Sequence, residues 1–139
     1  MEKKRVFVDM DNVLVDYFSG FKGLDDASDK ITAGVFARMK PLEGAIEAFN
    51  KLAEKHDVYI LSTAPWRNAT AWADKLDWVK KYLGESGYKR LILSHNKALL
   101  MGDYLIDDRT VNGAGEFTGE HIHFGTEKFP DWDAVLNYL

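Results

Sequence analysis

The 139-residue sequence contains no cysteine, so disulfide bonds and thiol chemistry are excluded and a reducing compartment is compatible. It also has no apolar run as long as a membrane span. Its basic start, residues 1–5, leads into only three apolar residues, too few for a signal peptide. Positive charge is not in excess either: the net charge is −4, which argues against binding to nucleic-acid polymers or anionic membranes. We therefore expect a soluble cytoplasmic protein without such partners.

What the chain does contain is an ordinary globular composition, with 46% hydrophobic, 13% aromatic and 29% charged residues. A chain of this length buries roughly two-thirds of the surface that its unfolded form exposes. It has no internal repeat, linker or low-complexity segment. We expect one compact domain over residues 1–139, and the sequence is also compatible with a homodimer.

Short apolar runs alternate with amphipathic stretches along the chain. The apolar runs predict five strands, at residues 6–8, 57–63, 91–93, 104–106 and 121–124. Helical spacing of apolar residues predicts three helices, at residues 43–54, 69–83 and 131–138, and Asp131 is the expected N-cap of the last. Residues 95–102 predict a short helix or turn. This alternation indicates βαβ units and an α/β protein with a mostly parallel central sheet.

Residues 17–41 interrupt this alternation. They begin with an aromatic, glycine-punctuated stretch, and Pro41 closes the segment. Ser28 or Asp29 can cap a short helix there, whose apolar residues are Ile31, Val35, Phe36 and Met39. We interpret the segment as a small insertion near the functional end of the sheet, or as a plain connection that contains one helix.

Acidic and hydroxyl side chains stand at the ends of three predicted strands. In chain order these pairs are Asp9 and Asp11, Ser62 and Thr63, and Asp107 and Asp108. The carboxyl ends of parallel strands meet at one edge of a sheet, so the pairs are expected to converge. Four carboxylates repel one another unless a divalent cation neutralises them, and oxygen-only ligands favour Mg²⁺ over zinc or copper.

Such an edge suits phosphate chemistry. Magnesium held by a few carboxylates usually completes its shell with waters and a substrate phosphate. A strand-end hydroxyl can bind a phosphate oxygen, and a lysine can balance its charge. One carboxylate can then attack phosphorus while another protonates the leaving oxygen.

Three stretches of the sequence resemble the motifs of the haloacid dehalogenase (HAD) superfamily of phosphotransferases. They are Asp9-Met10-Asp11-Asn12-Val13-Leu14, Ile60-Leu61-Ser62-Thr63-Ala64-Pro65 and Leu105-Ile106-Asp107-Asp108-Arg109. Within the superfamily the chain most resembles the 5′(3′)-deoxyribonucleotidases. Two further stretches carry that narrower similarity, namely Asp74-Lys75-Leu76-Asp77-Trp78-Val79-Lys80-Lys81-Tyr82-Leu83-Gly84 and His95-Asn96-Lys97-Ala98.

The resemblance implies a Rossmann-like three-layer HAD fold, with a mostly parallel sheet of about five strands and a much reduced cap at about residues 17–41. It implies a Mg²⁺-dependent phosphomonoesterase that hydrolyses (deoxy)nucleoside monophosphates through an aspartyl-phosphate. Asp9 is then the nucleophile and a metal ligand, and Asp11 is the general acid/base that gives the metal its backbone carbonyl. Asp108 completes the metal shell. Asp107 either binds the metal through a water molecule or contacts a residue that binds it.

The remaining implied roles concern the substrate. Ser62 is expected to bind the phosphoryl oxygens, with the backbone around Thr63 and Asn12. Two lysines are candidates for balancing the phosphate charge: Lys75, which we favour, and Lys97. Two residues are candidates for contact with the rest of the substrate, Tyr17, where the family has an aromatic that stacks on the base, and Arg109.

The sequence departs from the family pattern at two places. Asn12 replaces the usual glycine after the second aspartate, and asparagine tolerates a left-handed turn. The insertion at 17–41 is much shorter than the family's helical cap, which leaves open a sugar phosphate or another small phosphomonoester as substrate. A phospho-signalling module is a third alternative, although a receiver domain carries its phospho-acceptor on a later strand.

Tryptophan and histidine residues outside these motifs are not expected to form a further site. The four tryptophans are expected to lie in the core or to cover surface; they are Trp66, Trp72, Trp78 and Trp132. His121 and His123 alternate along the last predicted strand, and no metal site is expected from them.

Overall fold

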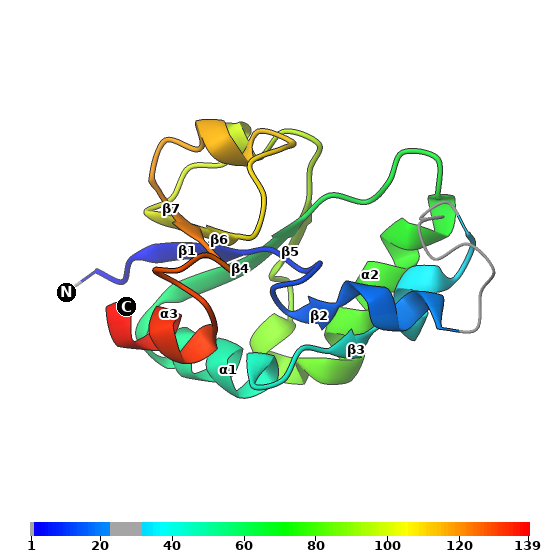
Figure 1. Ribbon diagram of the computed structural model, residues 1–139, viewed down its shortest axis with the longest axis horizontal. Helices are drawn as coiled ribbons and strands as arrows, with labels where there is room; N and C mark the ends of the chain where they lie inside the picture. Colours follow the sequence, from blue (N-terminus) through cyan, green and yellow to red (C-terminus); the bar gives the residue numbers. More distant parts are fainter. Residues whose placement is uncertain (1, 23–31) are drawn as a thin grey trace.

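A five-stranded sheet forms the centre of the protein, in the strand order β5-β4-β1-β6-β7, with every neighbouring pair parallel (Figure 1). The computed structural model describes residues 2–22 and 32–139. The strands are β1 (Arg5–Val8), β4 (Asp57–Ser62), β5 (Leu91–Leu93), β6 (Tyr104–Asp107) and β7 (Glu120–His123). The predicted five-stranded α/β fold is confirmed, with most strand ends within a residue of their predicted positions.

Successive residues of the three middle strands alternate between two cores on opposite faces of the sheet. On β1, Val6 and Val8 pack in the larger core and Phe7 packs in the smaller. The flanking strands divide in the same way, with Ile60 and Ile106 in the larger core and Leu61 and Leu105 in the smaller. Successive side chains of a strand point to opposite faces of the sheet. A continuous apolar run therefore has apolar side chains on both faces, and both faces must be covered to bury them.

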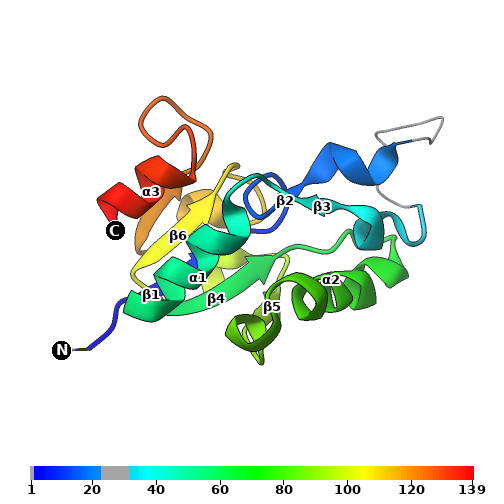
Figure 2. The same ribbon diagram turned by 90° about the horizontal axis from the view of Figure 1, so that it is seen from below.

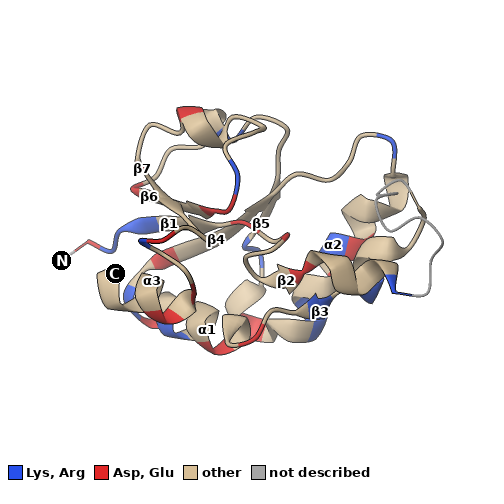
Figure 3. Ribbon diagram, viewed as in Figure 1, with Lys and Arg blue, Asp and Glu red and all other residues tan. Residues whose placement is uncertain are grey.

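Three α-helices cover the face of the larger core (Figures 1 and 2). They are α1 (Ala45–Lys55), α2 (Ala69–Tyr82) and α3 (Trp132–Tyr138). The predicted N-cap Asp131 accepts a hydrogen bond from the Ala134 amide at 3.0 Å. Both α1 and α2 carry acidic and basic residues on their outer sides (Figure 3). In the two described ranges, no helix combines the length and apolar character of a membrane crossing.

Two buried tryptophans tie this helical layer to the N-terminal part of the chain. The Trp78 Nε1 on α2 donates to the Met39 carbonyl at 2.9 Å, and the Trp132 Nε1 on α3 donates to the Val13 carbonyl at 2.7 Å. Both indoles are almost fully buried. A buried indole N–H requires a partner, and each of these finds one. The predicted packing role is confirmed for these two tryptophans.

The opposite face has a thinner layer. Short 3₁₀ turns, η4 (Lys97–Leu99) and η5 (Ala114–Glu116), lie in the connections on this side, and Ala114 and Phe117 pack in the smaller core. The short helix or turn predicted over residues 95–102 is therefore a single 3₁₀ turn. The third layer of the predicted three-layer fold consists of turns and loops.

The insertion begins and ends at a two-stranded antiparallel pair, β2 (Val15–Asp16) with β3 (Lys40–Pro41). Between them lie the 3₁₀ helices η1 (Tyr17–Phe21) and η2 (Val35–Arg38). The helix predicted to include Val35, Phe36 and Met39 is thus only the short η2, and Met39 follows it in extended conformation. The predicted caps Ser28 and Asp29, and Ile31, lie outside the described residues. A single domain with a cap-like insertion stays a prediction.

Candidate active site

The chain turns sharply after β1, and this turn places the first motif at the edge of the sheet. The Asp9 amide still donates to the Ile106 carbonyl of β6, at 2.9 Å. Three residues on, Asn12 has a φ of 61°, in the left-handed region. Its Oδ1 accepts from the Tyr17 amide at 3.3 Å. Asparagine tolerates this conformation because its short side chain bonds locally, so the predicted tolerance at this position is confirmed.

Three carboxylates converge beside this turn. Oxygens of Asp9, Asp107 and Asp108 all lie within 4.8 Å of one another. Asp9 follows β1, and Asp107 ends the neighbouring β6, so the parallel pairing of these strands brings the two together. Asp9 and Asp107 are buried and Asp108 is partly so. The predicted meeting of strand-end carboxylates therefore occurs for these three.

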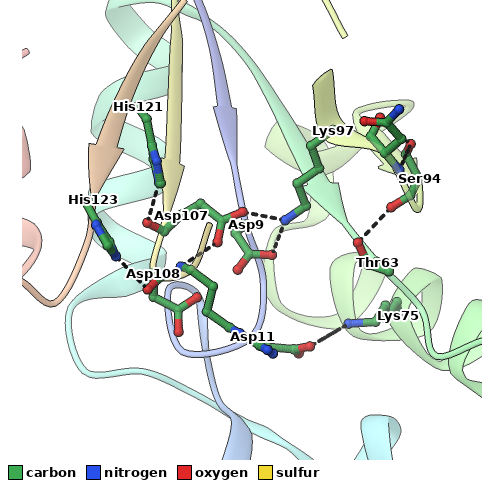
Figure 4. A network of polar contacts seen from close by, with 12 residues as sticks. Asp9, Asp11, Thr63, Lys75, Ser94, Lys97, Asp107, Asp108, His121 and His123 are labelled. Atoms are coloured by element: carbon green, nitrogen blue, oxygen red, sulfur yellow. Dashed lines mark hydrogen bonds and ion pairs between the residues drawn. The ribbon is translucent and has the colours of Figure 1, made fainter. Parts of the chain in front are cut away.

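A buried lysine lies within this acidic cluster (Figure 4). The Lys97 Nζ is 2.9 Å from Asp9 Oδ1 and 2.6 Å from Asp107 Oδ2. Its side chain is only 4% exposed. Lys97 comes from the η4 turn, whose N-cap Asn96 accepts from the Ala98 amide through its side chain at 3.1 Å. The turn therefore holds the lysine from the thin face of the sheet.

Burial and mutual repulsion shift the ionisation of this cluster. Burial raises the pKa of Asp9 to about 7; the Lys97 charge opposes this shift, and the charges of Asp107 and Asp11 add to it. Burial also raises the pKa of Asp108 to about 7, with a further contribution from Asp9. Burial disfavours the Lys97 cation, but the two aspartates beside it raise the pKa of Lys97 above its ordinary value. The cluster contains three carboxylates and one ammonium group, so a bound cation would reduce the repulsion between the carboxylates.

Asp11 lies apart from this cluster and pairs with a different lysine. The Lys75 Nζ on α2 is 3.2 Å from Asp11 Oδ1 and 4.5 Å from the centre of the Phe36 ring. Lys75 is 1% exposed, so its charge is balanced by this carboxylate and ring. If the strand continued through residues 9–11, its alternation would point the Asp9 and Asp11 side chains the same way. The strand ends at Val8, so this alternation does not continue through the turn.

The two candidate phosphate lysines thus have distinct surroundings. Lys97 contacts the acidic cluster and lines the cavity described below, whereas Lys75 contacts Asp11 and is not among the lining residues. The structure therefore places Lys97 at the cavity and the sequence-preferred Lys75 beside Asp11; which of the two contacts a phosphate stays a prediction.

The two hydroxyls at the end of β4 also differ. Ser62 is fully buried, and its Oγ has no hydrogen-bond partner among the described residues. The Thr63 Oγ1 donates to the Ser94 carbonyl at 2.7 Å, which ties the end of β4 to the loop after β5. Thr63 lines the cavity and Ser62 does not.

A cavity of about 480 Å³ opens at this edge of the sheet. Its floor contains the acidic cluster and Lys97, and its walls include the predicted substrate residues Tyr17 and Arg109. Other lining residues are Asp11, Asn12, Phe18, Phe36, Thr63, Pro65, Trp66, Arg67, His95, Val111 and Asn112. The volume is within the range of sites for small ligands.

Two histidines to which the sequence analysis gave no role hold the backbone of the second acidic motif (Figure 4). The Nε2 of His121 lies 3.0 Å from the Asp107 carbonyl oxygen, and the Nε2 of His123 lies 3.0 Å from that of Asp108. A carbonyl oxygen only accepts, so each Nε2 carries the hydrogen. Their rings stack with centroids 5.0 Å apart. The sequence does show two histidines spaced i, i+2. Their contacts with Asp107 and Asp108 could not be predicted from that spacing, because they depend on the pairing of β6 with β7.

Trp66 departs from its predicted packing role. Its side chain is 81% exposed and lines the cavity. His95, whose ring lies 5.6 Å from the Trp66 ring, also lines the cavity. Nothing in the sequence distinguished this tryptophan from the two buried ones.

The fold and the acidic cluster define a phosphatase of the HAD-like class. Comparison with known families gives the narrower assignment: residues 30–130 match the family described as "5′ nucleotidase, deoxy (Pyrimidine), cytosolic type C protein" (NT5C). The chain belongs to this family of 5′-nucleotidases, and the predicted resemblance is confirmed.

Individual relatives agree with this assignment. A protein of Vibrio phage KVP40 named "Putative 5′(3′)-deoxyribonucleotidase" is 57% identical over 145 residues, covering 99% of this chain and 85% of the phage protein. A Bordetella bronchiseptica protein with the same name is 42% identical over 110 residues, covering 77% of this chain but only 58% of that protein. The human 5′(3′)-deoxyribonucleotidase, cytosolic type, is 29% identical over 158 residues, covering 86% of this chain and 79% of the human protein.

Proposed function

We propose that this protein is a Mg²⁺-dependent phosphomonoesterase that hydrolyses deoxyribonucleoside monophosphates through an aspartyl-phosphate on Asp9. The observation that carries this proposal is the buried cluster of Asp9, Asp107 and Asp108 around Lys97, at the base of a ligand-sized cavity. The names of the relatives supply the substrate class. The cytoplasmic location and the homodimer stay predictions from the sequence.

The donor set of the cluster fits a magnesium ion. All three groups offer carboxylate oxygens, which Mg²⁺ prefers. The Asp108 Oδ1 is buried and has no hydrogen-bond partner among the described residues, so it is available for a ligand. Asp9 and Asp108 would hold the ion, together with the Asp11 carbonyl and with Asp107 directly or through water. When bound, the ion neutralises negative charge on the phosphate and on the carboxylates.

Asp9 is the proposed nucleophile. Its carboxylate attacks phosphorus, the bond from phosphorus to the ester oxygen breaks, and that oxygen leaves with a proton from Asp11. Asp11 then takes a proton from a water molecule, whose oxygen attacks phosphorus. The bond between phosphorus and Asp9 breaks, and inorganic phosphate leaves. The ion pair with Lys97 holds Asp9 in place, and the pair with Lys75 holds Asp11.

The phosphate would be bound by groups around the same turn. Lys97 is the proposed charge partner, because it lies in the cavity floor. The backbone around Thr63 and Asn12 is proposed to donate to the phosphoryl oxygens, since both residues line the cavity. Ser62 is proposed to bind a phosphoryl oxygen as well, because its buried Oγ has no hydrogen-bond partner among the described residues.

A substrate panel tests this proposal. Phosphate release from dUMP, dTMP, sugar phosphates and other small phosphomonoesters is measured with and without Mg²⁺. We expect deoxyribonucleotides to be preferred, and we expect turnover to vanish in EDTA and in the Asp9→Asn variant. Equal turnover of sugar phosphates would instead support the alternative substrate class. A stable phosphoprotein without multiple turnover would support a phospho-signalling module.

A further inference from the structure

Trp66 is the most exposed large aromatic residue in the walls of the cavity, with 81% of its side chain accessible. Tryptophan is usually well buried in folded proteins, because its large apolar surface gains most from leaving water. Trp78 and Trp132 follow that rule and are almost fully buried. Because this exposed indole also lines a ligand-sized cavity, it is available for contact with a ligand.

The backbone presents Trp66 from a fixed turn. The Asn68 amide donates to the Pro65 carbonyl at 3.1 Å, which closes a turn with Trp66 and Arg67 at its centre. Asn68 is 2% exposed; its side chain accepts from the Ala71 amide at 3.3 Å and donates to the Thr32 carbonyl at 3.0 Å. The turn is thereby joined to the start of α2. Little ordering is then needed when a ligand contacts the indole, which favours binding.

A second loop supports the indole from the side of β5. The His95 ring contacts two indoles, with its centroid 5.6 Å from that of Trp66 and 5.9 Å from that of Trp72. The Thr63 Oγ1 bond to the Ser94 carbonyl joins the two loops at their bases. Trp66 and His95 line the cavity, whereas Trp72 is not among the lining residues. We name Trp66 and His95 the core aromatic wall.

One aromatic residue of the insertion is arranged differently. Tyr17, the residue that the resemblance suggests for base stacking, already contacts three phenylalanine rings. Its ring centre lies 5.4 Å from Phe18, 5.1 Å from Phe21 and 6.2 Å from Phe36. Its ring is therefore largely engaged within the insertion, and the indole of Trp66 has more free surface to offer a planar ligand.

We propose that Trp66 is the stacking surface for the nucleobase, supported by His95, so that the core of the protein rather than its small insertion selects nucleotides. This inference rests on the proposed function and extends it to the residue that determines specificity. The phosphate would lie beside Lys97 while the base lies against the indole, because Lys97 and Trp66 line the same cavity. Stacking on an aromatic side chain accepts any base, so the wall selects for the presence of a base more than for its identity.

The test compares dUMP with deoxyribose 5-phosphate, which has the same sugar and phosphate but no base. Steady-state kinetics are measured for the wild type, Trp66→Ala, Trp66→Phe and a control, Tyr88→Ala. Tyr88 is 66% exposed and is not among the residues that line the cavity. We expect Trp66→Ala to lower kcat/KM for dUMP about tenfold, mainly through KM, and to leave deoxyribose 5-phosphate unchanged. Trp66→Phe should restore part of the loss, and Tyr88→Ala should behave as wild type.

The outcomes separate this inference from the proposed function. If wild-type protein hydrolyses neither compound, the proposed function and the inference are both overturned. If it hydrolyses dUMP preferentially and Trp66→Ala keeps that preference, only the inference is overturned. An equal loss on both compounds in Trp66→Ala would also overturn it, because the loss would then reflect a disturbed site and not the missing stack.

Discussion

Asp9 and Lys97 form a buried ion pair of 2.9 Å although they are 88 positions apart in the sequence. The same ammonium lies 2.6 Å from Asp107, so one lysine joins the ends of β1 and β6. Both lysine and aspartates are almost fully buried. Because buried charges are costly without partners, this contact links the stability of the fold to the chemistry of the site.

Replacing Lys97 should therefore impair both properties. Lys97→Met leaves the carboxylates without their cation, and we expect it to lower the free energy of unfolding by about 3 kcal/mol. We also expect a loss of kcat of about a hundredfold or more, because the charge that faces the phosphate is removed. Urea unfolding and phosphatase assays measure the two effects.

The exposed Lys80 of α2 is the matched control, and Lys80→Met should change neither quantity. Full activity in Lys97→Met, combined with a large loss in Lys75→Met, would reverse our assignment of the two lysines.

Removing the metal should abolish turnover, and the loss should depend on Asp108. We expect Asp108→Asn to raise the Mg²⁺ concentration for half-maximal activity by about tenfold or more, because a charged oxygen donor becomes a neutral one. Asp77→Asn, at an exposed position of α2, is the control. A variant at Asp108 with an unchanged Mg²⁺ titration would contradict the metal role of this residue.

His123 should act through the backbone of Asp108. In His123→Ala the Asp108 carbonyl loses the ring N–H that now lies 3.0 Å away, so the acidic motif is held less firmly. We expect a weaker response to Mg²⁺, by about tenfold. His123→Gln retains an N–H donor and should recover part of the response. If the two variants titrate alike with Mg²⁺, the hydrogen bond does not position the motif.

A pH-dependent contribution to stability is expected from Asp57, at the opposite end of the sheet. Its Oδ1 accepts from Arg90 Nη1 at 2.5 Å, and its Oδ2 accepts from Arg5 Nε at 3.4 Å. Burial favours the protonated form, but these two arginines lower the pKa of Asp57 below its ordinary value. A lowered pKa means that the ionised form is stabilised by folding. The contribution is therefore complete above the ordinary carboxyl pKa of about 3.9 and is lost as the pH falls through the lower folded value.

The matching variant is Asp57→Asn. Because the ion pairs are partly exposed, it should lower the free energy of unfolding by about 1 kcal/mol or less at neutral pH. Urea unfolding at a series of pH values should show this difference shrinking below about pH 4. A difference that stays constant into acid would indicate that the asparagine disturbs packing rather than charge.

The sequence by itself determined the strands and the chemistry at their ends. Short continuous apolar runs and apolar residues with a period of 3.6 are local patterns, so the α/β class follows from short stretches of chain. The convergence of Asp9 with Asp107 and Asp108 also followed, because parallel strands end at one edge of a sheet. The left-handed turn at Asn12 could also be predicted from the sequence, since this conformation depends on the residue's own side chain.

Only the tertiary structure decided which lysine meets which carboxylate. Lys75 and Lys97 lie on opposite sides of the sheet, on α2 and on the η4 turn, and the order of the strands determines which aspartate each can reach. The exposure of Trp66 also depends on the tertiary structure, namely on the turn at residues 65–68 and on the loop that carries His95. Contacts between distant residues depend on strand order, register and loop direction, and a local pattern carries none of these.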